Sequence, residues 1–187
     1  MATYIHPSAE VADDAVVGEN TKIWHLVQVR PGAHIGSECI FGRGVFVDGH
    51  VLIGNRVKVQ NYVSIYDGVT IEDGVFVGPH VVFTNDKQPR AVNADGSLKS
   101  GSDWTISYTR ICEGASLGAN STIVCGITVG RWALVGAGSV VTKDVPDYGL
   151  VVGNPARLIG FVCKHGRRIP EGADPATYPC ECEEKKS

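Results

Sequence analysis

Residues 83–89, FTNDKQP, place five polar side chains in a row, from Thr84 to Gln88, after a stretch rich in Val and Ile. The Asn85 amide can both donate and accept hydrogen bonds, Asp86 supplies a carboxylate, and Lys87 supplies a cation. Gln88 follows, and its amide cannot take up a proton as a histidine can. This group of residues could bind and orient a polar substrate, but it offers no histidine-type general base.

An internal repeat with a period of six precedes this cluster. Every sixth residue from position 5 onward is aliphatic or Phe, and the residue four positions further on is mostly small and apolar. The large apolar positions are Ile5, Val11, Val17, Ile23, Val29, Ile35, Phe41, Val47, Ile53, Val59, Ile65, Ile71, Val77 and Phe83. The repeat stops after Phe83 and resumes at Ile111, at a distance that is not a multiple of six. An excursion of about residues 86–107 therefore interrupts it.

This period predicts an all-β helix of short strands, with one large and one small apolar side chain per hexad pointing into a narrow interior. Glycine and small polar residues are expected at the corners between strands. An ordinary β-sandwich would instead show period-two alternation and irregular turn spacing. A long loop that leaves such an array beside a polar cluster is typically functional.

The pattern resembles the hexapeptide-repeat acyltransferases over about residues 5–160. That resemblance implies a left-handed parallel β-helix in which three hexads form one coil, an exception to the usual crossover rule. It also implies a homotrimer with active sites between subunits. We expect residues 1–160 to form this domain and residues 161–187 to form a tail without the repeat.

If three hexads form one coil, residues that are three hexads apart are stacked neighbours. Tyr66 then lies beside Thr84, Asp67 lies beside Asn85, and Arg30 heads the first column. Arg30, Tyr66, Asp67 and Asp86 are therefore candidate substrate contacts. Arg30 is a candidate cation for a carboxylate or phosphates, with Lys87 and Arg90 as weaker ones.

A second resemblance lies in residues 135–160, VGAGSVVTKDVPDYGLVVGNPARLIG, which are similar to the coenzyme A end of these acetyltransferases. There the pantetheine arm lies along a groove lined by small residues. The matching residues here are Ala119, Ala137, Thr142, Lys143, Pro155 and Arg157. The resemblance thus implies acetyl-CoA as co-substrate, with Lys143 and Arg157 near its phosphates.

Residues 77–89, VGPHVVFTNDKQP, resemble the catalytic region of galactoside- and maltose-type acetyltransferases, in which a His-Pro pair carries the general base. Here the pair is Gln88-Pro89. An alcohol needs a base to become nucleophilic, whereas an amine of lowered pKa does not. The substitution therefore favours N-acylation over O-acylation.

The FTND stretch and the segment LVVGNPARLIGFVC resemble one subgroup more closely. These bacterial enzymes acetylate UDP-2-acetamido-3-amino-2,3-dideoxy-glucuronate on the route to O-antigen and other surface polysaccharides. The resemblance implies that Asn85 lies at the reacting centre, where it orients the amine or polarises the thioester. An acetyltransferase of a nucleotide-linked 4-amino sugar remains the alternative.

Two other classes of protein fit the sequence less well. The γ-type carbonic anhydrases share the fold but need three zinc-binding histidines, and only His80 is present, with Asn85 and Gly44 at the other two positions. A non-catalytic scaffold conflicts with the coenzyme A resemblance. In the tail, Cys163, His165, Cys180 and Cys182 do not have standard zinc spacing, so we expect no metal.

Composition sets further expectations. The net charge is −3 and no basic stripe occurs, so we expect no nucleic acid partner. No secretory signal and no apolar run of membrane-spanning length are present, so we expect a cytoplasmic bacterial enzyme with reduced thiols and no membrane partner.

Overall fold

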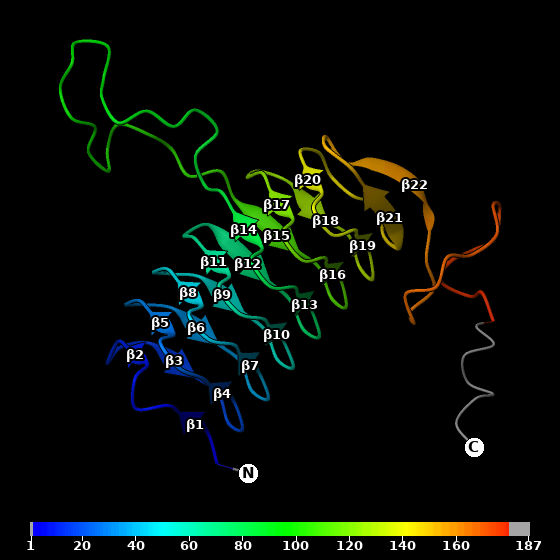
Figure 1. Cartoon of the computed structure of the whole chain (residues 1–187), viewed down its shortest axis with the longest axis horizontal. Coiled ribbons are helices and arrows are strands. Elements are labelled where there is room, and N and C mark those ends of the chain that lie inside the picture. The colour runs from blue at the N-terminus through cyan, green and yellow to red at the C-terminus, as the bar shows by residue number, and fades with distance from the viewer. Residues whose placement is uncertain (1, 180–187) are drawn as a thin grey trace.

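The computed structural model describes residues 2–179, and the regular structure in them consists of strands, most of them two residues long. Such short strands cannot be stable alone, so each pairs with its equivalent in the next turn of the chain. The result is a stack of three-sided coils whose sides form three sheets, here called A, B and C (Figure 1).

The strands follow one another around the three sides. Sheet A contains β1 (Tyr4–Ile5), β4 (Lys22–Ile23), β7 (Ile40–Phe41), β10 (Lys58–Val59), β13 (Phe76–Val77), β16 (Ser116–Leu117), β19 (Leu134–Val135), β21 (Gly149–Val152) and β22 (Arg157–Phe161). Sheet B contains β2 (Glu10–Val11), β5 (Gln28–Val29), β8 (Phe46–Val47), β11 (Ser64–Ile65), β14 (Val82–Phe83), β17 (Thr122–Ile123) and β20 (Val140–Val141). Sheet C contains β3 (Val16–Val17), β6 (His34–Ile35), β9 (Leu52–Ile53), β12 (Val69–Ile71), β15 (Thr109–Ile111) and β18 (Thr128–Val129).

Successive coils pair in parallel and in a fixed register. Tyr4 pairs with Lys22 in sheet A, and Gln28 pairs with Phe46 in sheet B, so the step between coils is three hexads. The fold is a left-handed parallel β-helix of hexapeptide repeats, which confirms the fold class expected from the period and from the family resemblance. The antiparallel pair β21–β22 ends the array.

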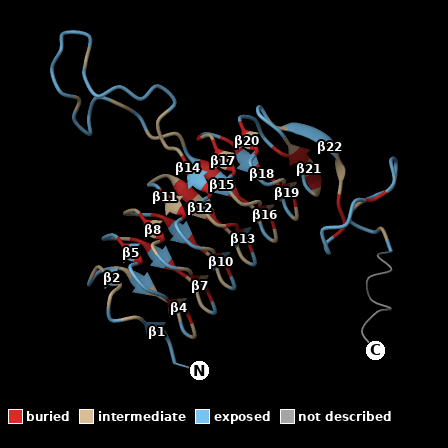
Figure 2. Ribbon diagram, viewed as in Figure 1, coloured by how far each residue is buried: buried red, intermediate tan, exposed pale blue. Residues whose placement is uncertain are grey.

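The interior is filled as the repeat predicts, because the large and small apolar positions of most hexads are buried (Figure 2). Phe41 and Phe83 are completely buried. The first coil differs: Ile5 is 44% exposed, and Val11 and Val17 are only partly buried. No described coil precedes it to cover these side chains.

The corners differ from the expectation of glycine and small polar residues. Bulky residues also adopt the left-handed conformation there, including Leu26 (φ 57°), Tyr62 (φ 57°) and Trp132 (φ 54°). This conformation costs a residue other than glycine about 1–2 kcal/mol, and the strand pairing on both sides offsets it. Gly78 has a different role, because a Cβ there would lie 2.7 Å from the backbone nitrogen of Ala119 in the next coil.

The chain leaves the array after β14 and re-enters it at β15. Val82 pairs with Thr122, a much longer step than three hexads, so the excursion is inserted within this single coil. It projects away from the coils (Figure 1), and its residues are mostly exposed (Figure 2). The pairing of later coils returns to three hexads, as between Thr122 and Val140.

Beyond β22 the chain forms an isolated antiparallel bridge between Val162 and Arg168. Cys180 and Cys182 of the predicted tail lie outside the described residues, and the division at residue 160 stays a prediction. Residues 2–179 contain no helix of the length and apolarity needed to cross a membrane.

The packing of the core predicts that substitutions at inward positions lower the free energy of unfolding far more than substitutions at outward positions. Phe41→Ala should lower the free energy of unfolding by about 3–5 kcal/mol, because a fully buried ring leaves a cavity. Lys58→Ala, on the exposed side of neighbouring strand β10, should change it by about 0.5 kcal/mol or less. Urea unfolding measures both, and equal losses would contradict the packing described.

Candidate active site

The corner between sheets B and C carries most of the predicted site residues. Thr84, Val124 and Thr142 each directly follow a strand of sheet B in three successive coils. The Thr84 N–H donates to the Ile123 carbonyl (3.0 Å), and the Val124 N–H donates to the Val141 carbonyl (2.9 Å). We call this edge the BC corner.

The next position along the chain puts Asn85, Cys125 and Lys143 in one column of the BC corner. Adjacent strands are about 4.8 Å apart, so Asn85 and Lys143 lie about 10 Å apart along the array. Sequence spacing did not reveal this neighbourhood, because the excursion lengthens the step from Val82 to its partner Thr122.

Asn85 is held from two sides. Strand β14 fixes its N-terminal side, and its carbonyl accepts a hydrogen bond from the Ser107 N–H (3.0 Å) on the returning arm of the excursion. Its side chain is partly buried and makes no hydrogen bond within residues 2–179. The amide is therefore available to a ligand.

A cavity of about 690 Å³ opens at the BC corner and is lined by the residues on either side of Asn85, but not by Asn85 itself. Thr84, Asp86, Lys87, Thr142 and Lys143 are among the residues that line it. Lys87 folds over the backbone, since a Cβ on Gly126 would lie 2.6 Å from its Nζ. In the described part of the chain neither lysine has an ion-pair partner. Two ammonium groups so placed can bind phosphate or carboxylate.

Tyr66 and Asp67 occupy the same corner one strand earlier. The Tyr66 side chain is 38% exposed, and its ring packs against Phe46 with 5.8 Å between centroids. The Asp67 N–H donates to the Asp48 carboxylate (3.4 Å), which orders the turn. Both residues therefore lie close to Asn85, as the columns predicted.

Arg30 lies farther away. It is three strands before Thr84, about 14 Å along the array. It lines a separate cavity of about 300 Å³ together with Glu10 and Gln28. The structure therefore does not bring Arg30 beside Asn85 within one chain.

The small residues of the predicted coenzyme A groove lie on the other edge of sheet B. Ala119 and Ala137 follow strands of sheet A and precede β17 and β20, at what we call the AB corner. The turn that contains Pro155 reaches this side of β20, because the Val140 N–H donates to Gly153 and the Val140 carbonyl accepts from Ala156. Arg157 is exposed and donates to the Ala156 carbonyl (3.0 Å). Thr142 and Lys143 are thus separated from the other predicted coenzyme A contacts by the width of sheet B.

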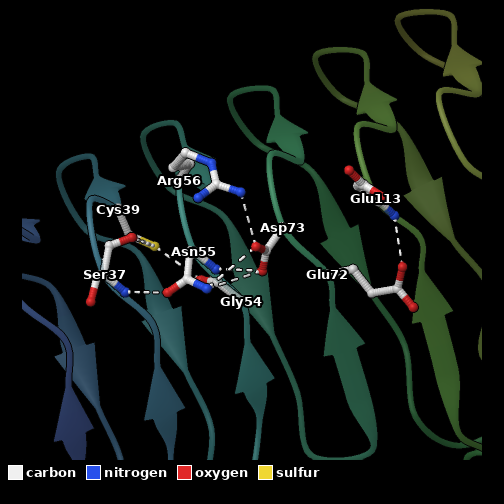
Figure 3. Close-up of polar contacts among 8 residues, drawn as sticks. All are labelled: Ser37, Cys39, Gly54, Asn55, Arg56, Glu72, Asp73 and Glu113. Atoms are coloured by element: carbon white, nitrogen blue, oxygen red, sulfur yellow. Dashed lines mark hydrogen bonds and ion pairs between the residues drawn. The ribbon is translucent and has the colours of Figure 1, made fainter.

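Another cavity, of about 540 Å³, lies over sheet C and is lined by Glu72, Asp73 and Glu113. Figure 3 shows the polar contacts of these residues. The carboxylates of this cavity are used by the scaffold. Asp73 accepts the Asn55 N–H (2.8 Å) and pairs with Arg56 (3.0 Å). Asn55 in turn accepts the Ser37 N–H (2.9 Å). The result is a ladder of side chains that links successive coils.

These contacts keep both acids charged. The backbone hydrogen bond from Asn55 is the main reason why the pKa of Asp73 lies below its usual value. Burial opposes the charge on Glu72, but the Glu113 N–H and the Arg110 guanidinium more than compensate and lower its pKa. Because their oxygens already serve the coils, these acids are poor candidates for catalysis.

No metal centre is formed by residues 2–179, where no three His, Cys, Asp or Glu side chains are arranged to hold an ion. His80, the one histidine that a carbonic anhydrase site could use, stacks on Tyr62 with 5.3 Å between ring centroids. Cys163 is buried, whereas Cys180 and Cys182 lie outside the described residues.

Comparison with known proteins adds independent findings. The family model described as bacterial transferase hexapeptide (six repeats) matches residues 14–49, 50–85 and 108–143, and so omits the excursion. A curated relative from Aneurinibacillus thermoaerophilus, dTDP-3-amino-3,6-dideoxy-alpha-D-galactopyranose 3-N-acetyltransferase, is 47% identical over 163 residues, which cover 86% of this chain and 79% of that protein.

Two solved structures share the fold. Galactoside acetyltransferase in complex with coenzyme A is 25% identical, with a TM-score of 0.58, over 68% of this chain and 64% of that chain. A histidine-to-alanine mutant of GDP-perosamine N-acetyl transferase from Caulobacter crescentus, in complex with coenzyme A and GDP-perosamine, is 20% identical with a TM-score of 0.50. That match covers 86% of this chain and 57% of that chain.

The ladder on sheet C predicts a pH-dependent contribution to stability. The pKa of Asp73 is lower in the folded state, so its contribution is present above the pKa of the unfolded chain and is lost as pH falls through the folded value. Asp73→Asn should therefore cost about 1–2 kcal/mol at pH 7, and the difference from the wild type should shrink below about pH 4. Thermal unfolding at several pH values measures this.

The control is Asp13→Asn, which removes an exposed carboxylate that makes no hydrogen bond among residues 2–179. It should leave the unfolding temperature nearly unchanged at every pH. A loss for Asp73→Asn that stays constant with pH would show that the charge has no part in the ladder.

Proposed function

The chain belongs to the bacterial transferase hexapeptide family, and on this premise we propose that it transfers the acetyl group of acetyl-CoA to an amino group of a nucleotide-linked sugar. The observation that carries the proposal is the 47% identity to a nucleotide-sugar 3-N-acetyltransferase over 86% of the chain. The presence of Gln88 where a histidine base is expected agrees with an amine acceptor.

The proposed reaction needs little proton transfer. The neutral amine attacks the thioester carbonyl, the C–N bond forms, the C–S bond breaks, and the proton passes to the departing sulfur or to water. Base catalysis contributes roughly 10²–10⁴-fold where an alcohol is the nucleophile. With an amine, orientation and stabilisation of the developing oxyanion supply most of the rate.

We assign Asn85 to orienting the amine and stabilising the developing oxyanion. Its amide has no hydrogen bond within the described residues, and it lies between the column of Asp67 and the cavity lined by Thr142 and Lys143. From there it can hold the amine or donate to the thioester oxygen. Tyr66, Asp67 and Asp86 are proposed to contact the sugar. Thr142 and Lys143 are proposed to contact coenzyme A.

For the acceptor we propose a sugar with its amino group at C3. The sequence resemblance supports UDP-2-acetamido-3-amino-2,3-dideoxy-glucuronate, which would place the enzyme in cytoplasmic O-antigen synthesis. The curated relative acts on a dTDP-linked 3-amino-3,6-dideoxy sugar, which has no C6 carboxylate and is the second candidate. The two candidates share the amine position and differ in the nucleotide and at C6.

A homotrimer follows from the same premise. The predicted coenzyme A contacts occupy two opposite edges of sheet B, with Ala119 and Ala137 at the AB corner and Lys143 at the BC corner. Copies packed around a threefold axis can set the AB corner of one against the BC corner of the next. This arrangement would complete the site between subunits, and it would also allow Arg30 to act on a neighbouring site.

The assignment of Asn85 predicts unequal effects of two neighbouring substitutions. Asn85→Ala should lower kcat by about 10²-fold or more, because it removes the group that orients the reaction. Gln88→Ala, its matched control on the same segment, should retain most of kcat, because Gln88 has no role in proton transfer. Release of the coenzyme A thiol measures both, and equal large losses would overturn the assignment.

The proposed chemistry also predicts the order of acceptors. The panel comprises UDP- and dTDP-linked 3-amino sugars with and without the C6 carboxylate, a 4-amino sugar, and a 3-hydroxy analogue. A 3-amino sugar should react fastest, and the 3-hydroxy analogue should be slower by about 10²-fold or more for want of a base. Mass spectrometry of the products measures turnover.

Preference for the uronate selects the first candidate, and preference for a 6-deoxy sugar selects the second. Turnover of only the 4-amino sugar would move the enzyme to the neighbouring class. A protein that acetylates no amine and binds no acetyl-CoA would favour the non-catalytic scaffold instead.

A further inference from the structure

We propose that the excursion between β14 and β15 carries the binding site for the nucleoside diphosphate of the acceptor, an inference that rests on the proposed function. The site is a cavity of about 570 Å³ between the two arms of the excursion. The outgoing arm contributes Asp86, Pro89 and Arg90, and the returning arm contributes Lys99 and Trp104. Its volume lies within the range of small-molecule sites.

The cavity is preformed, because the two arms pair with each other. The Lys99 N–H donates to the Ala91 carbonyl (3.0 Å), and the Asn93 N–H donates to the Ser97 carbonyl (2.8 Å). An antiparallel bridge joins Val92 to Leu98 between these bonds. The excursion is therefore an ordered hairpin held away from the coils (Figure 1).

The turn before Trp104 is also fixed. The Asp103 carboxylate accepts both the Ser100 N–H (2.6 Å) and the Ser100 hydroxyl (2.7 Å). These two bonds are the main reason why the pKa of Asp103 lies below its usual value, with smaller contributions from Asn93 and from the charge of Lys99. Trp104 follows this turn directly, so the position of its backbone is fixed.

The chemistry of the lining fits a nucleobase joined to a pyrophosphate. Arg90 and Lys99 form no salt bridge within residues 2–179, although the charge of Lys99 interacts with the Asp103 carboxylate, and the Arg90 guanidinium donates only to the Pro89 carbonyl (2.9 Å). The Trp104 ring is half-buried and contacts no other aromatic ring or cation of the described chain. Guanidinium and ammonium groups bind phosphate, and an open indole face stacks on a base.

One residue connects this site with the proposed reaction centre. Asp86 lines both the cavity of the excursion and the cavity at the BC corner that holds Thr142 and Lys143. A nucleotide-linked sugar can therefore place its amine at Asn85, its hexose at Asp86, and its nucleoside diphosphate along the hairpin.

Coenzyme A also contains a base joined to a pyrophosphate, so the hairpin could in principle bind either the nucleotide sugar or coenzyme A. The predicted coenzyme A contacts Ala119, Ala137 and Lys143 all lie on the coils and not on the excursion. We therefore assign the hairpin to the acceptor. The experiment contains separate arms for the two sources.

The test compares Trp104→Ala with Trp104→Phe, and Arg90→Gln/Lys99→Gln with Lys58→Gln, which removes one exposed cation from strand β10. Trp104→Ala and the double variant should each raise the KM for the nucleotide sugar by about 10-fold or more, with kcat changed by less than about 3-fold. The KM for acetyl-CoA should stay constant. Trp104→Phe, which keeps an aromatic face, should raise the KM for the nucleotide sugar less than Trp104→Ala does, and Lys58→Gln, which lies outside the site, should behave as the wild type.

Calorimetry with UDP, dTDP and adenosine 3′,5′-bisphosphate tests the site without turnover. The wild type should bind UDP or dTDP, and Trp104→Ala should bind that nucleotide about 10-fold more weakly or worse. Asn85→Ala should bind it as the wild type does. If the wild type acetylated no amino sugar but lost UDP or dTDP binding on Trp104→Ala, the site would stand and the proposed reaction would fail.

Three results would overturn the inference. The first is an unchanged KM for the nucleotide sugar in both site variants, with acetyl transfer intact. The second is a rise confined to the KM for acetyl-CoA, with loss of adenosine 3′,5′-bisphosphate binding. The third is a wild-type protein that binds neither UDP nor dTDP.

Discussion

The parallel pairing of each coil with the next is the constraint on which the rest of this structure depends. Backbone hydrogen bonds such as Thr84 N–H to Ile123 and Val124 N–H to Val141 fix every residue above its equivalent in the preceding coil. A shift of one residue would turn the apolar side chains outward, so the register is strongly specified. Residues at a corner are consequently placed in columns with a spacing of about 4.8 Å. This is how short polar segments far apart in sequence come to line one cavity.

The same constraint explains why a long excursion is tolerated at one corner. The chain can leave after Phe83 and return at Thr109 as long as the returning strand pairs in register, and Val82 does pair with Thr122. Closing a longer loop costs little additional entropy, about 0.6 kcal/mol for each doubling of its length. Added side-chain atoms are less well tolerated where two coils are in close contact. At Gly78, for example, a single added Cβ would meet the backbone of the next coil at 2.7 Å.

Much of the fold could be predicted from the period of six, because burial of Phe41 and Phe83 follows directly from their position in the hexad. The period does not tell which of the three sides a hexad occupies. Ala137 and Lys143 have the same place in their hexads, yet they lie on opposite edges of sheet B. The pairing of the Asn85 column with Lys143 was hidden by the inserted excursion. The left-handed conformation of Leu26 and Trp132 had no local signal, because strand pairing on both sides of the corner imposes it.

The proposed absence of a histidine base and the proposed nucleotide site on the hairpin both bear on how the acetyl transfer would obtain its rate. An enzyme without a proton acceptor at the reacting centre must obtain its rate from orientation, and orientation is supplied by binding energy from parts of the substrate that do not react. The nucleoside diphosphate is the largest such part of the proposed acceptor. A site for it on the ordered hairpin, joined through Asp86 to the cavity beside Asn85, would apply that binding energy where the amine has to be aligned. The scaffold residues Asn55 and Asp73 on sheet C can then remain devoted to holding the coils in register.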